Sequence, residues 1–122
     1  GTYRWICEFD RAQIIACRAA LGVAPDTDAI IVDVNRYSEA DATPTSTTIY
    51  TTQANRPQVA VGELIGIRTV PDVVMLYEGD SLTVDVDQAD FAGDGAAASL
   101  TVSVYMVVQH SDTNVSWAWA DE

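Results

Sequence analysis

Two segments of the chain, about 50 residues apart, alternate apolar and polar side chains with a period of two. The first is residues 30–35 (Ile-Ile-Val-Asp-Val-Asn), and the second, within residues 76–88, ends in Leu-Thr-Val-Asp-Val-Asp-Gln. This period places every other side chain on the same side of an extended strand, so each segment has one face for the core and one for solvent. The pattern therefore predicts a fold built from half-buried β-strands.

Shorter segments of the same kind extend along the chain. Besides residues 29–37 and 81–87, strands are predicted at residues 2–7, 13–21, 47–53, 58–61, 64–70, 73–76 and 100–108. Turns and loops rich in Gly, Pro, Asp and Ser separate them. This spacing predicts one all-β domain, an antiparallel β-sandwich of about eight strands at residues 1–109, followed by a C-terminal tail or arm at residues 110–122.

Residues 11–21 have two interpretations. Ala, Arg, Gln and Leu are good helix formers, so an amphipathic helix is the rival to a strand. The strand is preferred because residues 22–28 are typical of a turn. In that strand Ile15, Cys17 and Ala19 are expected to face inward.

The charge balance limits the partners of this chain. It has 18 acidic residues against six basic ones, all arginine, and a net charge of −12. Such a chain repels nucleic acid and anionic membrane surfaces, and no apolar run approaches the roughly 18–20 residues of a membrane helix. The composition fits a halophilic protein, whose acidic surface suits high salt, or an acidic extracellular protein that lacks lysine because of its genome composition.

Cys7 and Cys17 are the two cysteines. A structural zinc site needs about four ligands at close spacing, which two cysteines do not provide. They either form a disulfide, if the segments around them pair as a hairpin, or are buried as small apolar side chains.

Four polar residues on the two clearest strands are weak candidates for a metal site. If those strands are neighbours, Asp33, Asn35, Asp85 and Asp87 share one face and offer oxygen ligands of the kind that Ca²⁺ prefers. The alternative is a solvated face of two strands, which the lack of a local calcium-binding loop favours. The prediction is therefore no metal and no cofactor.

The single histidine gives no catalytic site. His110 is followed by Ser111 and Asp112, but adjacent residues on an extended chain cannot form a Ser–His–Asp triad. The chain also has no Gly-x-Ser-x-Gly nucleophile elbow. We therefore expect a protein that is not an enzyme.

Three residues are candidates for contacts at an interface. Arg56 precedes Pro57 in an acid-rich chain, so we expect a carboxylate partner within the subunit or across a subunit contact. Trp117 and Trp119 share a face if the tail is extended, and tryptophan is enriched at interfaces because it buries a large area at low entropic cost. They either pack on their own domain or anchor the chain on a neighbouring protein.

A series of short motifs runs in a fixed order from residue 3 to residue 108. They are Val23-Ala24-Pro25, Val32-Asp33-Val34-Asn35, Ile49-Tyr50-Thr51, Asn55-Arg56-Pro57, Gly79-Asp80, the strand at 82–88 and Leu100-Thr101-Val102. In this order they resemble the jelly-roll-like β-sandwich module of fibre and capsid-decoration proteins of tailed viruses, from phages or archaeal viruses.

The resemblance implies a non-enzymatic structural protein of the virion surface. Such modules assemble as homotrimers, contact other virion proteins, and in some cases aid adhesion to a host glycan or receptor. The loops at residues 38–46 and 89–99 would then face host or solvent. The alternative from a different class is a carbohydrate-binding module of a secreted or cell-surface protein, although only 8% of the residues are aromatic.

Overall fold

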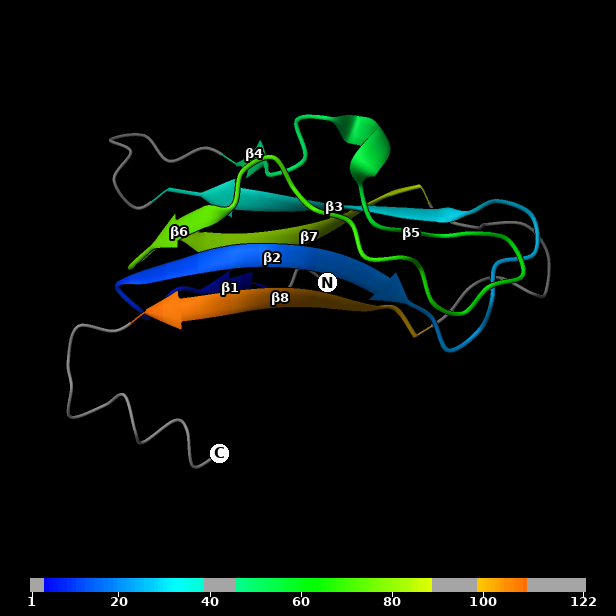
Figure 1. The fold of residues 1–122 in the computed structure, drawn as a ribbon. Coiled ribbons are helices and arrows are strands. Elements are labelled where there is room, and N and C mark those ends of the chain that lie inside the picture. The colour runs from blue at the N-terminus through cyan, green and yellow to red at the C-terminus, as the bar shows by residue number, and fades with distance from the viewer. Residues whose placement is uncertain (1–3, 39–45, 89–98, 110–122) are drawn as a thin grey trace, which may run out of the picture.

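The computed structural model describes residues 4–38, 46–88 and 99–109, which form two antiparallel sheets packed face to face (Figure 1). The strands are β1 (Arg4–Ile6), β2 (Arg11–Ala20), β3 (Ile30–Tyr37), β4 (Thr47–Thr48), β5 (Gln58–Val59), β6 (Met75–Tyr77), β7 (Ser81–Gln88) and β8 (Thr101–Gln109), with a short 3₁₀ helix η1 (Gln53–Asn55). The prediction of an all-β antiparallel sandwich with about eight strands is confirmed.

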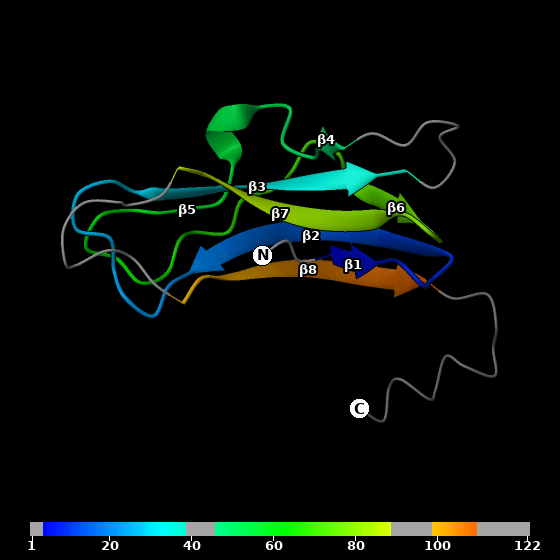
Figure 2. The ribbon, with the colours of Figure 1, turned by 180° about the vertical axis from the view of Figure 1, so that it is seen from behind.

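Successive strands mostly change sheet. The first sheet has the order β1-β7-β3-β4, with β5 also paired to β3, and the second has the order β6-β2-β8. The chain enters the second sheet at β2, β6 and β8 and otherwise lies in the first, which is a jelly-roll-like alternation. Viewed from behind, β3 and β7 again lie over β2 and β8 (Figure 2). Strands β1 and β8 therefore end their sheets on the same side of the sandwich.

Strand β2 contains a β-bulge that the sequence pattern does not reveal. The strand is confirmed over the helical alternative, but its register with β8 shifts between Ile14 and Ala16. The extra residue changes which side chains face the core. Ile14 is 1% exposed and Ile15 is 47% exposed, so the prediction that Ile15 faces inward is wrong. Beyond the bulge, Cys17 and Ala19 are buried as expected.

Two predicted strands are shorter than expected. The β-branched segment 47–53 forms only the two residues of β4, because the Thr48 hydroxyl accepts the backbone N–H of Tyr50 at 3.0 Å and turns the chain. Segment 64–70 touches β2 only through isolated bridges at Ile65 and Thr69. There Gly66 passes so close to β5 that an added Cβ would lie 2.0 Å from the Gln58 carbonyl oxygen.

The core lies between the sheets and is mainly aliphatic. One buried cluster consists of Cys7, Ala12, Ile14, Cys17, Val34, Ile49, Tyr50, Leu76 and Leu82, and a second of Ala19, Leu21, Ile30, Val32 and Val59. The inward face predicted for β3 is confirmed. In β7, the same alternation places Val86 on the inward face with Leu82, but Val86 is 50% exposed whereas Leu82 is 5% exposed.

Candidate interaction surface

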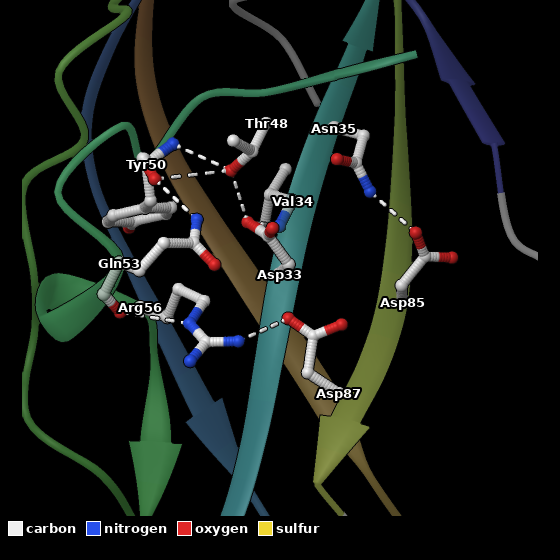
Figure 3. Close-up of polar contacts among 9 residues, drawn as sticks. All are labelled: Asp33, Val34, Asn35, Thr48, Tyr50, Gln53, Arg56, Asp85 and Asp87. Atoms are coloured by element: carbon white, nitrogen blue, oxygen red, sulfur yellow. Dashed lines mark hydrogen bonds and ion pairs between the residues drawn. The ribbon is translucent and has the colours of Figure 1, made fainter.

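Strands β3 and β7 bring the four predicted metal candidates to one face. Asp33 lies directly opposite Asp85, and Asn35 donates a hydrogen bond from Nδ2 to Oδ2 of Asp85 at 2.6 Å (Figure 3). Asp87 follows on the same face of β7. The three carboxylates have different hydrogen-bonding partners. Within residues 4–38, 46–88 and 99–109, no three His, Cys, Asp or Glu side chains form a group that could hold a metal ion.

Asp33 and Asn35 are not on a solvated face, which corrects the simplest sequence interpretation. Each is only 8% exposed, because residues 47–55 fold over this side of β3. Asp33 Oδ1 accepts the Thr48 hydroxyl at 2.5 Å and the backbone N–H of Val34 at 2.9 Å. The Asp33 carboxylate therefore fixes the covering segment in place, a structural role that uses its hydrogen-bonding capacity.

Arg56 has a carboxylate partner within the chain. Its Nη1 lies 2.5 Å from Oδ2 of Asp87, and its Nε donates to the Gln53 carbonyl oxygen at 2.9 Å (Figure 3). The two side chains of the ion pair are 22% and 33% exposed. Arg56 therefore links η1 to strand β7. Of the two predicted locations for its carboxylate partner, the structure shows one within the same chain.

Both cysteines are free thiols in the core. Burial raises the pKa of Cys7 and of Cys17, and this effect outweighs the hydrogen bonds that link Cys7 to the Phe9 backbone and Cys17 to the Tyr50 side chain. Of the two interpretations of the sequence, the structure has buried small apolar side chains and no disulfide between them.

Tyr50 closes one side of the sandwich. It is fully buried, donates from its hydroxyl to the Thr69 carbonyl oxygen at 3.1 Å, and accepts from the Thr69 hydroxyl at 3.0 Å. Burial raises the pKa of Tyr50 far above its usual range, and the hydrogen bond to Cys17 adds to the shift. This buried hydroxyl is therefore a structural link between the sheets.

The outer face of the second sheet carries the least expected feature of the molecule. Strands β2, β6 and β8 and residues 64–70 contain none of the 18 acidic residues but three of the six arginines, Arg11, Arg18 and Arg68. We call this surface the acid-free face. The exposed apolar side chains of these segments are Ile15 (47%), Leu64 (49%), Ile65 (60%), Ile67 (74%), Val70 (61%), Tyr77 (53%) and Val107 (62%).

Strand register places the arginines and the apolar side chains of this face together. Arg11 and Gln13 alternate with core residues of β2, and Gln13 is paired with Val107 of β8. The Arg68 guanidinium stacks 4.4 Å from the ring centroid of Tyr105 on β8, which is a cation–π contact across the sheet. By contrast, the outer face of the first sheet carries Asp33, Asp85 and Asp87.

Sequence reasoning missed the acid-free face. The signal was present, since residues 11–21, 64–71 and 99–109 all lack acids. These segments are far apart in the sequence, and only their pairing into one sheet makes them one surface.

Trp117 and Trp119 lie outside the described residues, as do His110 and the loops at 39–45 and 89–98. Among the described residues, no helix is long and apolar enough to cross a bilayer. Comparison of the chain with protein-family models, with characterised proteins and with solved structures finds no match. The case for a function therefore rests on the surfaces described above.

Proposed function

We propose that the chain is a non-enzymatic structural module of a virion surface and works as one subunit of a homotrimer, in a capsid decoration, a turret or a tail fibre. The observation that carries the assembly role is the acid-free face. The virion assignment rests on the order of sequence motifs that resembles tailed-virus modules.

The composition of the acid-free face is that of an interface. The cores of protein interfaces are depleted of Asp, Glu and Lys and enriched in Arg and aromatic residues, and contiguous exposed apolar patches mark interaction sites. The segments of this face have seven exposed apolar side chains and three arginines in a chain of net charge −12. Covering this face with a partner removes its apolar surface from water, which stabilises the assembly.

Charge favours another copy of the chain in a head-to-tail arrangement. Two acid-free faces placed against each other would bring Arg11, Arg18 and Arg68 of one copy near those of the other. An acidic surface of a neighbouring copy complements these arginines instead. A contact between two different patches is heterologous, and heterologous contacts close into rings such as a trimer.

Light-scattering mass at several salt concentrations tests the proposal. A trimer has about three times 13.1 kDa, or about 39 kDa. We expect it to weaken at low salt, where a Debye length of about 30 Å at 0.01 M lets the net charges of the copies repel one another. A monomer at every salt concentration would contradict the proposal, and a monomer that binds glycans would favour a carbohydrate-binding module.

A pair of variants locates the contact. Val107→Glu puts a charge on the acid-free face and is expected to dissociate the trimer. Val61→Glu is the matched control, because Val61 is 49% exposed in a turn outside this face. Dissociation by both variants, or by neither, would contradict assembly through the acid-free face.

A further inference from the structure

The sandwich is open on the side where β1 and β8 end their sheets. A pocket of about 390 Å³ lies there between the sheets. Its lining is Arg4, Trp5, Val34, Leu82, Val84, Val102, Val104 and Met106. Strand β2 contributes nothing to this lining, so the pocket belongs to the outer edge of the sandwich and not to its centre.

Strand β8 offers a free edge beside this pocket. It pairs with β2 on one side, and among the described residues no strand pairs with its other side. A free edge presents backbone N–H and C=O groups that another strand can use. Three even-numbered side chains of β8, Val102, Val104 and Met106, line the pocket and are only partly buried. Among the described residues, no strand pairs with the free edge of β8, and no apolar side chain fills the pocket.

The thirteen residues after β8 contain a segment with the matching pattern. Val115, Trp117 and Trp119 are at alternate positions, so an extended segment places all three on one face. A connection of four residues, 110–113, sets residue 114 opposite residue 109 of β8. Trp117 then lies opposite Met106, and Trp119 opposite Val104.

The match of faces does not depend on one particular turn. Any connection with an even number of residues pairs the odd-numbered residues of the tail with even-numbered residues of β8, which face the pocket. Directly opposite residues in an antiparallel pair project to the same side of the sheet. The charges agree as well, since among the described residues Arg4 is the one charged residue in the pocket lining, and Asp121 and Glu122 follow Trp119 closely in the sequence.

We propose that residues 114–119 pair with the free edge of β8 in the same chain, and that Trp117 and Trp119 fill the pocket beside Trp5. This adds a strand to the second sheet and closes the open side of the sandwich. The proposal is independent of the homotrimer and of the virion role, because the segment and the pocket belong to one chain.

Fluorescence of Trp5 tests the proposal in the full-length chain. The three tryptophans are Trp5, Trp117 and Trp119, so replacing the last two leaves Trp5 as the only one. The pair Trp117→Leu/Trp119→Leu keeps an apolar filling, and the pair Trp117→Ser/Trp119→Ser removes it. We expect acrylamide to quench Trp5 several-fold more efficiently in the serine pair than in the leucine pair.

Two outcomes would overturn the proposal. Equal quenching of Trp5 in both pairs would mean that the tail does not cover the pocket. Protection of Trp5 that disappears on dilution to the monomer, followed by light scattering, would mean that the tail of a neighbouring copy fills it instead. As a second measurement, slow amide hydrogen exchange within residues 114–119 of the unaltered chain is expected, and fast exchange there would contradict an added strand.

Discussion

The two long sides of the sandwich are closed in different ways. On one side, the backbone of Ile49 accepts hydrogen bonds from Asp72 and Val73 and donates to Val34 of β3, and Tyr50 seals the gap. On the other side, Trp5 is 37% exposed and borders an apolar pocket of about 390 Å³. The first side has a segment that crosses between the sheets, and among the described residues the second side has none.

The difference shows what a crossing segment contributes to a small sandwich. Ile49 and Tyr50 bury apolar surface completely and also satisfy backbone groups that would otherwise be left unpaired at a sheet edge. Trp5 and the inward face of β8 offer apolar surface of the same kind, but the described residues do not cover it. Closing an edge of the sandwich therefore requires a chain segment that crosses it, in addition to apolar side chains.

The largest expected effect tests the closed side directly. Tyr50→Ala removes a fully buried ring and should lower the free energy of unfolding by about 3–5 kcal/mol in urea denaturation. The comparison is Trp5→Ala in the Trp117→Ser/Trp119→Ser background, where the tail cannot fill the pocket. Because Trp5 is then more than a third exposed, we expect a loss of only about 1–2 kcal/mol.

Similar losses in the two variants would break the comparison between the sides. In that case Trp5 would be packed as tightly as Tyr50 even without the tail. A loss for Trp5→Ala that is larger in the unaltered chain than in the serine background would instead sharpen the comparison, because it would show that the tail adds contacts to Trp5.

An intermediate effect concerns pH, and Tyr50 and Cys17 on the closed side contribute to it together with Cys7. Burial keeps Tyr50 and Cys17 protonated in the folded state, since the pKa of each is raised, while in the unfolded chain they ionise near about pH 10 and 8.5. Stability is therefore fully present below about pH 8.5 and is lost as the pH rises. The slope is about 1.4 kcal/mol per pH unit for each group that ionises only on unfolding.

Urea denaturation between pH 7 and pH 11 measures this loss. Tyr50→Phe should make the decline above pH 10 shallower, although its stability at pH 7 is lower by about 1 kcal/mol for the missing hydrogen bonds. Tyr77→Phe, which changes a tyrosine that is 53% exposed, is the matched control. An unchanged slope in Tyr50→Phe would show that ionisation of Tyr50 does not contribute to the loss of stability at alkaline pH.

The sequence predicts one side of the molecule better than the other because strands and crossings leave different signals. The period of two in residues 30–35 and 82–88 correctly gives the inward face of β3 and the shared face of Asp33 and Asp85, because alternation depends only on local geometry. The Thr48 hydroxyl that turns the chain, the bulge at Ile15 and the hydrogen bonds of Tyr50 depend on partners distant in sequence. The apolar and polar alternation of the sequence therefore cannot predict these features.

The same limit applies to the surfaces. Arg56 was correctly expected to have a carboxylate partner, because an arginine in an acid-rich chain has many acidic residues available for an ion pair. That this partner is Asp87 depends on the pairing of β7 with β3. The acid-free face shows the limit more clearly. Its four segments are ordinary when taken one by one and become a surface only through the strand order β6-β2-β8 and the bridges that join residues 64–70 to β2.

The smallest expected effect lies on the outside of the closed side, at the ion pair between Arg56 and Asp87. A double-mutant cycle with Arg56→Ala and Asp87→Ala should give a coupling energy below about 1 kcal/mol, because both side chains are partly exposed and water screens them. The coupling should fall further in 1 M salt, where the Debye length is about 3 Å. Arg56→Ala alone should cost more than Asp87→Ala, since Arg56 also holds the Gln53 carbonyl of η1. A coupling well above about 1 kcal/mol that falls with salt, or equal losses in the two single variants, would mean that the covering segment is held to β7 by charge. The contrast between the two sides would then rest on electrostatics and not on the buried crossing at Ile49 and Tyr50.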